Sequence, residues 1–154
     1  MKITVDHFTF PGPVAVGEYS AHDDGGWIFP AWCAEINQYL QFGEVINYEY
    51  VDGLSAWSAP ISLSLDELMS WAAGAGWPSD AVQSEAMQRD IWSILAGGQG
   101  VLDIGQPVLT MHAGLLHHDS RQDLLVARAV IEPDPLALLI PALLLLAAFR
   151  LVRQ

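Results

Sequence analysis

The first sixty residues alternate between apolar and polar positions in short runs that end at turn residues. Residues 3–10 and 45–51 show this alternation most clearly, and residues 11–13, 23–26 and 52–53 are rich in Pro, Gly and Asp. A period of two is typical of half-buried strands, and turn signals about every 8–12 residues are typical of an antiparallel sandwich or barrel. Short apolar runs at Val108-Leu109 and at 124–127 indicate that strands return near the end of the body.

Residues 64–95 follow a helical period instead. The first predicted helix begins with the capping-box pair Ser64 and Glu67 and ends at Gly74-Ala75-Gly76, and the second begins at Ser79 and ends at Gly97-Gly98. Their apolar positions recur every three or four residues, at Leu65, Leu68, Met69 and Ala72 and then at Val82, Ala86, Ile91 and Leu95. The pattern predicts an α+β fold, an antiparallel β-sandwich or barrel with a two-helix insertion at 64–96.

The last residues differ from everything before them. Residues 136–149 carry no charge, and Leu151 and Val152 extend the apolar stretch past Arg150. Fourteen helical residues span about 21 Å, and snorkelling of Arg150 lets the helix approach the ~30 Å of a bilayer core. A buried core helix is the alternative, but such a helix normally keeps one polar face. We therefore expect a body at 1–131 and a tail at 132–154 with a C-terminal transmembrane helix at 136–152.

The tail resembles the PEP-CTERM sorting signal, in which a Pro-Glu-Pro signature precedes a Leu/Ala-rich span and terminal arginines. Here the signature region is Glu132, Pro133, Asp134 and Pro135, and the arginines are Arg150 and Arg153. Either Glu132-Pro133 lacks the first proline or Pro133-Asp134-Pro135 carries Asp for Glu, and the second register aligns the span better. The resemblance implies processing by exosortase and export in a Gram-negative bacterium. The expected location is an inner-membrane-anchored precursor and then the outer surface or exopolysaccharide matrix.

Export through such a tail also requires an N-terminal signal. Residues 1–10 instead read as the first strand of a folded domain, without an apolar run of signal-peptide length. We therefore expect Met1 to be an internal methionine, with an in-frame signal peptide encoded upstream of it.

Composition narrows the function of the body. The net charge is −12, from 18 acidic and 6 basic residues, so the surface repels phosphates and nucleic-acid binding is excluded. The single cysteine, Cys33, cannot form an internal disulfide, and an unpaired thiol in an exported protein needs another explanation. The single lysine, Lys2, suits a domain that reacts with amines, although a lysine-poor genome would also account for it.

Two motifs in the body resemble the bacterial thioester domains of surface adhesins. In that family an aromatic-Cys motif on a strand pairs with a helix that reads Thr-Gln-x-Ala-Ile-Trp. Here Trp32-Cys33 matches the first motif, and residues 87–92, Met-Gln-Arg-Asp-Ile-Trp, match the second with Met for Thr and Asp for Ala. The resemblance implies an internal thioester between Cys33 and Gln88 that an amine on a target surface or exopolysaccharide can attack. Glu35 shares a strand face with Cys33 and is the candidate proton acceptor.

Other interpretations stay open at this stage. Cys33 could be a small buried apolar residue and Gln88, which lies off the apolar stripe through Val82, could be a surface residue. The body would then be a non-reactive matrix protein of the same fold. A cysteine-nucleophile enzyme pairing Cys33 with His112 or His117 is a third candidate, but no oxyanion-hole motif supports it and no enzyme is predicted. The cluster of His112, His117, His118 and Asp119 lacks a complete ligand set, so neither a metal nor a cofactor is expected.

Overall fold

The computed structural model describes residues 1–10, 16–35, 38, 40–105 and 107–130. Within this part of the chain the elements run in the order β1 (Lys2–Phe8), β2 (Tyr19–Asp23), β3 (Ile28–Cys33), β4 (Val45–Asn47), β5 (Glu49–Asp52), α1 (Gly53–Ala56), α2 (Ala59–Ala75), α3 (Ala81–Leu95), β6 (Met111–His117) and β7 (Leu124–Ala129). The predicted α+β class is confirmed, with α2 and α3 inserted between strands as expected.

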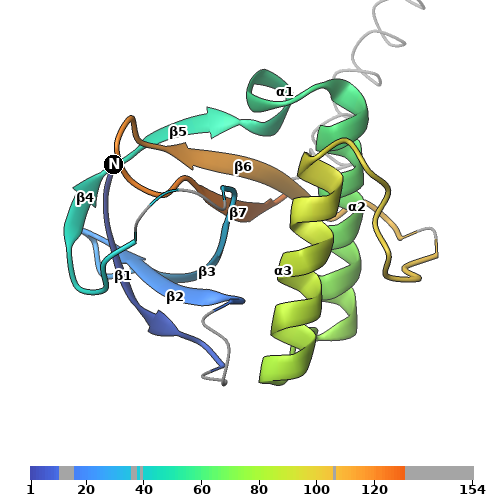
Figure 1. The fold of residues 1–154 in the computed structure, drawn as a ribbon, viewed down its shortest axis with the longest axis horizontal. Coiled ribbons are helices and arrows are strands. Elements are labelled where there is room, and N and C mark those ends of the chain that lie inside the picture. The colour runs from blue at the N-terminus through green and yellow to red at the C-terminus, as the bar shows by residue number, and fades with distance from the viewer. Residues whose placement is uncertain (11–15, 36–37, 39, 106, 131–154) are drawn as a thin grey trace, which may run out of the picture.

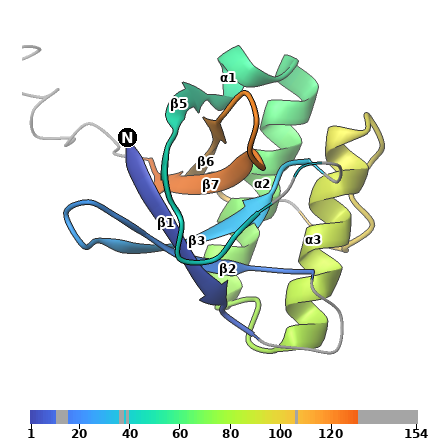
Figure 2. The same cartoon turned by 60° about the vertical axis from the view of Figure 1, so that its left-hand side comes forward.

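The strands form one antiparallel sheet that curls into a nearly closed barrel (Figure 1, Figure 2). The order across the sheet is β4-β1-β2-β3-β7-β6-β5, so β4 and β5 are its two edges. Only Tyr48 separates these two strands in the chain. Its backbone is hydrogen-bonded to Met1, the residue before β1, with N···O distances of 2.6 and 2.7 Å. The edges therefore lie next to each other because the chain passes directly from one to the other.

The interior of the barrel is the first of two apolar cores. Alternation along each strand turns every second side chain inward, as Ala31 and Cys33 on β3 and Leu124 and Val126 on β7 show. The remaining buried members of this interior are Ile3, Val5, Tyr19, Ala21, Ile46, Tyr48 and Leu116.

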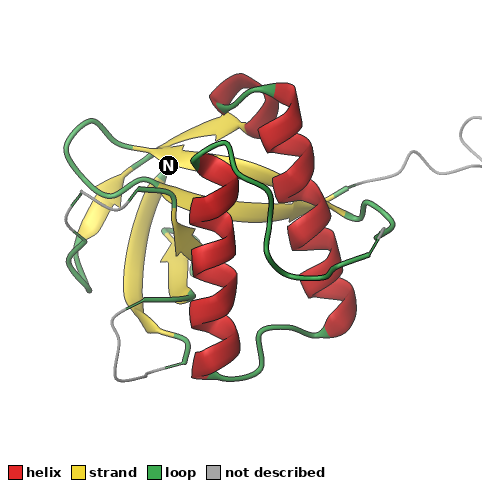
Figure 3. Cartoon of the chain, turned by 45° about the vertical axis from the view of Figure 1, so that its right-hand side comes forward, coloured by secondary structure: helices red, strands yellow, loops and turns green. Residues whose placement is uncertain are grey.

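The second core lies between the outside of the barrel and the two long helices. α2 and α3 run side by side along one face of the sheet, and a short connection joins them (Figure 3). The alternate residues Trp32 of β3 and Leu125 of β7 turn toward them. Helical spacing supplies the opposite surface, which consists of Leu65, Leu68, Met69, Ala72, Met87, Ile91 and Ile94.

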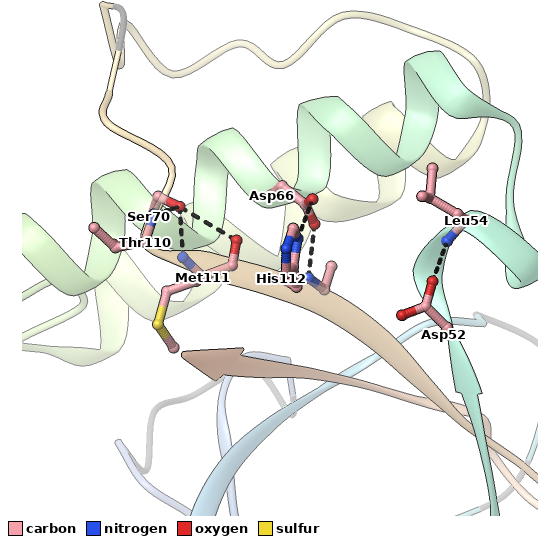
Figure 4. Close-up of polar contacts among 8 residues, drawn as sticks. Asp52, Leu54, Asp66, Ser70, Thr110, Met111 and His112 are labelled. Atoms are coloured by element: carbon pink, nitrogen blue, oxygen red, sulfur yellow. Dashed lines mark hydrogen bonds and ion pairs between the residues drawn. The ribbon is translucent and has the colours of Figure 1, made fainter. Parts of the chain in front are cut away.

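Polar side chains of α2 also attach this helix to the backbone of β6 (Figure 4). Asp66 accepts a hydrogen bond from the Ala113 N–H at 2.7 Å and contacts Nδ1 of His112 at 2.8 Å. One turn later, the Ser70 hydroxyl accepts from the N–H groups of Thr110 and Met111, each at 3.0 Å. The helix thereby satisfies backbone groups of β6 at the end where the strand begins.

The predicted helix starts need correction. α2 begins at Ala59, with Ser58 at the N-cap and Pro60 in the first turn, so Ser64 lies inside the helix and the Ser64–Glu67 capping box is wrong. The helix starts earlier because proline is tolerated in a first turn, where its missing N–H would have no partner. α3 is capped by Asp80, whose carboxylate accepts from the Gln83 N–H at 2.9 Å, rather than by Ser79. Both C-terminal ends agree with expectation, and Gly76 has a φ of +65°.

The strand prediction also needs one change near the end of the body. Val108-Leu109 is not in a strand, and the strand there is β6, which begins at Met111, whereas the predicted strand at 124–127 lies within β7. The predicted tail, with its sorting signature and membrane span at 136–152, lies outside the described residues. Among the residues that are described, no helix combines the length and apolar character needed to cross a bilayer.

Candidate functional site

The candidate site lies where β2 and β3 separate. The two strands pair from His22 opposite Ile28 to Tyr19 opposite Ala31, and Cys33 lies beyond the end of this ladder. On its other side Cys33 is opposite Leu124 of β7. The backbone N–H and C=O of Cys33 thus need partners on the side that β2 no longer covers.

Helix α3 fills this gap with two polar side chains, one turn apart. The Ser84 hydroxyl accepts a hydrogen bond from the Glu18 N–H at 2.7 Å, just before β2 begins. The Gln88 side chain reaches β3, where its Oε1 accepts from the Cys33 N–H at 2.9 Å and its Nε2 donates to the Cys33 carbonyl at 2.8 Å. Residues at i and i+4 share one helix face, so α3 contacts both separated strands with a single surface.

The Gln88 amide is fully buried, with a relative exposure of 0 %. Its orientation is fixed by its partners, because the Cys33 N–H can only donate and the carbonyl can only accept. The indole Nε1–H of Trp92, one turn further along α3, donates to the same carbonyl at 3.1 Å. The expectation that Gln88 could be a surface residue is therefore wrong, and the three motif residues Cys33, Gln88 and Trp92 are brought together.

The thiol of Cys33 lies inside the barrel and is only 7 % exposed. Its Sγ is 2.8 Å from the hydroxyl of Tyr19, which the sequence analysis did not single out. Burial raises the pKa of Cys33 to about 11, although the hydrogen bond from Tyr19 opposes this shift. Burial, together with the neighbouring Cys33, also raises the pKa of Tyr19 above its ordinary value. Both groups are therefore protonated at neutral pH.

This arrangement contains the parts that an intramolecular acyl transfer requires. The amide carbon Cδ of Gln88 is the acyl group, and the thiol belongs to the residue whose backbone holds that amide. Rotation about χ1 moves Sγ on an arc around the same backbone. The Cys33 N–H already donates to Oε1, the atom on which negative charge would develop during attack at Cδ.

Asp90, which replaces the Ala of the family motif, does not enter the site. Its carboxylate accepts hydrogen bonds from the N–H groups of Val101 and Leu102 in the segment after α3. Two positions along a helix correspond to about 200° of rotation, so Asp90 and Gln88 lie on opposite sides. The site around the Gln88 amide therefore gains no charge from this substitution.

Glu35, the predicted proton acceptor, lies two residues past the thiol. β3 ends at Cys33, so the strand-face reasoning that placed Glu35 beside the thiol does not apply. Its backbone carbonyl accepts from the Gln122 amide. Partial burial and then the Asp123 carboxylate raise the pKa of Glu35, whereas His117 lowers it. Among the described residues, the hydrogen-bond partner of Sγ is the Tyr19 hydroxyl. A role for Glu35 stays a prediction.

The two histidines considered as catalytic partners, His112 and His117, contact carboxylates rather than Cys33. His112 contacts Asp66, and His117 contacts Asp123 through Nδ1 at 2.8 Å and Asp119 through Nε2 at 3.4 Å. Its hydrogen bond with Asp123 raises the pKa of His117. Across the described residues, the hydrogen bonds of Cys33 include no histidine, and no group of three or more His, Cys, Asp or Glu side chains is arranged to hold a metal.

Three participants, Ser84, Gln88 and Tyr19, had only a weak signal in the periodicity of the sequence. Ser84 and Gln88 continue the buried stripe of Met87, Ile91 and Ile94 at helical spacing, but their polarity concealed this, and the exposed Val82 suggested a different stripe. Tyr19 is separated from Cys33 by 14 positions, and only strand pairing brings them together.

Comparisons of the chain with protein-family models, with curated proteins and with solved structures give no significant match.

Proposed function

We propose that this chain is an exported surface protein whose body attaches covalently to target amines through a Cys33–Gln88 thioester. One observation carries the proposal: a fully buried glutamine amide on α3 holds both backbone polar atoms of the only cysteine, at 2.9 and 2.8 Å, across 55 positions of sequence. Bond formation joins Sγ to Cδ of Gln88 and breaks the bond from Cδ to Nε2. The thiol proton leaves with that nitrogen as ammonia.

Burial suits a bond of this kind. A thioester in water hydrolyses, and the low exposure of Cys33 and Gln88 limits the access of water to it. The target is an amine-bearing surface or exopolysaccharide, and an acidic chain with one lysine offers few competing amines of its own. No metal or cofactor takes part.

The proposed route to the surface rests on the tail. In this proposal residues 132–154, with Pro133, Pro135 and the terminal Arg150 and Arg153, serve as a PEP-CTERM sorting signal with a C-terminal transmembrane helix. In this proposal exosortase processes the tail of an inner-membrane-anchored precursor, and the body reaches the outer surface or matrix of a Gram-negative bacterium.

A non-reactive matrix protein of the same fold is the second candidate, and one observation favours it. The intact Gln88 amide already satisfies the N–H and C=O of Cys33, and burial keeps the thiol protonated by raising its pKa to about 11. The same contacts would then serve only to complete the open end of β3.

Intact mass separates the two candidates. The wild-type chain, purified in mild detergent and denatured before measurement, should weigh less than its sequence mass by one ammonia. Methylamine should add at Gln88 and release one thiol, which iodoacetamide then labels. Cys33→Ala and Gln88→Glu provide matched controls that cannot form the bond and should keep their full masses. A wild-type chain of full mass with one labelled thiol before methylamine treatment would leave the matrix protein as the function.

The tail is tested by truncation after Glu132. The shortened chain should be folded and soluble without detergent, while the full chain partitions into membranes. Aggregation of the shortened chain, together with solubility of the full chain in plain buffer, would identify residues 136–149 as part of a core instead.

A further inference from the structure

We propose that the Tyr19 hydroxyl stabilises the Cys33 thiolate, both when the thiolate attacks Gln88 and when it leaves during transfer to an amine. This inference rests on the proposed thioester, and it adds a residue that neither motif contains. Among the described contacts, the Tyr19 hydroxyl is the hydrogen-bond partner of Sγ, at 2.8 Å.

The position of this hydroxyl is well determined. Tyr19 is the first residue of β2 and pairs with Ala31, two residues before Cys33, so both side chains enter the barrel from adjacent strands. Its ring stacks on that of Phe8, with 4.8 Å between the ring centroids, and the centroid of the Phe42 ring lies 6.0 Å away. Because these rings pack around it, the Tyr19 ring keeps its hydroxyl next to Sγ of Cys33.

Chemistry decides which partner donates. A thiolate can only accept a hydrogen bond, and the raised pKa of Tyr19 keeps its proton on oxygen while the thiol ionises. Tyr48, the other buried tyrosine described in this interior, donates to the Gln122 carbonyl at 3.0 Å instead. Hydrogen bonds to charged groups are stronger than those to neutral ones, so Tyr19 favours every state in which sulfur is negative.

The same contact serves both directions. During formation, the thiolate attacks Cδ of Gln88 while the Cys33 N–H donates to Oε1. The bond from Cδ to Nε2 then breaks, and the proton that the thiol gave up joins the leaving nitrogen to give ammonia. During transfer, the amine nitrogen bonds to Cδ, the bond from Sγ to Cδ breaks, and the departing sulfur accepts from Tyr19. The excess proton of the amine then passes to the thiolate, so the thiol and a substituted Gln88 amide are the products.

The test compares two variants that each remove one buried tyrosine hydroxyl. Tyr19→Phe removes the partner of Sγ, and Tyr48→Phe is the matched control in the same interior. Both are made in the full chain, and methylamine uptake is followed by intact mass over time. Tyr19→Phe should accumulate less bonded protein and take up methylamine about tenfold more slowly, since a hydrogen bond to a charged group is lost. Tyr48→Phe should match the wild type in both.

A second readout separates a specific role from loss of packing. After methylamine treatment, the released Cys33 thiol is alkylated with iodoacetamide over a range of pH. The midpoint of the alkylation profile should move to higher pH in Tyr19→Phe and stay in place in Tyr48→Phe.

The outcomes distinguish failure of the proposed Tyr19 role from failure of the proposed thioester. Loss of ammonia in the wild type, with equal uptake rates and equal midpoints in both variants, would overturn the role of Tyr19 and leave the thioester standing. A wild type of full mass would overturn both. Slower methylamine uptake in Tyr19→Phe without a shifted alkylation midpoint would mean that Tyr19 acts only through packing, which would also contradict the inference.

Discussion

Two helices attach polar side chains to strand backbones in this protein, and the two junctions differ in what surrounds them. α2 places Asp66 and Ser70 on β6, and α3 places Gln88 on β3. In both cases a side chain satisfies backbone groups that would otherwise lack partners. The hydrogen bonds alone therefore do not distinguish a reactive junction from a structural one.

The difference lies in chemistry and water access. At the α2 junction a carboxylate faces His112, whose side chain is 55 % exposed, and no thiol is present. At the α3 junction a neutral amide with 0 % exposure adjoins the only cysteine, whose thiol contacts a buried tyrosine hydroxyl. An amide carbonyl next to a thiol can exchange its acyl group, whereas a carboxylate that pairs with a histidine cannot. The environment of the contact, rather than the contact itself, suggests reactivity.

The largest expected effect is removal of the α3 contact. The test is made in a Cys33→Ala background, which cannot form a thioester. There Gln88→Met should lower the free energy of unfolding by about 3 kcal/mol, because the buried backbone N–H of residue 33 loses its hydrogen-bond partner. Urea denaturation measures this. The control is Gln83→Met on the same helix, which removes exposed hydrogen bonds with Ser79 just before the helix and should cost under about 1 kcal/mol. Equal losses in the two variants would contradict the comparison.

An intermediate effect concerns the thiol at alkaline pH. Burial raises the pKa of Cys33 from about 9 in an exposed thiol to about 11 in the folded chain, so the protonated thiol stabilises the fold below about pH 9. This contribution, at most about 2.7 kcal/mol, is lost as pH rises from about 9 through 11. Relative to Cys33→Ala, methylamine-treated wild type should lose stability over this window in urea titrations. A constant difference between the two proteins from neutral pH to above 11 would show that burial does not disfavour the thiolate.

The smallest effect is expected at the α2 junction. Asp66→Asn keeps an oxygen that can accept from the Ala113 N–H but loses the charge that faces His112. The expected loss in the free energy of unfolding is about 1 kcal/mol. Glu67→Gln makes the same change of charge at the next position of α2 and should have less effect in the same urea assay. A loss larger than that of Gln88→Met would reverse the ranking of the two junctions.

The sequence predicted the classes of element better than their boundaries. Alternation at residues 3–10 identified β1, and Leu65, Leu68 and Met69 identified α2, because apolar periodicity follows burial. The run at 45–51 was predicted as one strand, but the structure divides it at Tyr48 into β4 and β5. The start of α2 was missed because Pro60 in a first helical turn looks like a break. β6 was missed because Gly114 and two histidines interrupt its apolar alternation.

The candidate site was only partly within reach of the sequence. A motif resemblance paired Cys33 with Gln88, but apolar periodicity left a surface position for Gln88 open, since a polar residue does not reveal a buried helix face. Tyr19 could not be found, because its contact with Cys33 depends on the register of β2 against β3. Strand register is a property of the whole sheet, so local patterns do not determine it.

The place of β7 in the sheet has a mechanical consequence. β7 lies between β3 and β6 and is hydrogen-bonded to both. A pulling force directed along β7 from its C-terminal end would load both ladders in shear, so their hydrogen bonds would have to break together rather than one at a time. Loading in shear shares the force among many bonds. A tether at this end would therefore hold the body by one of its more resistant strands, while the edge strands β4 and β5 stay outside the line of force.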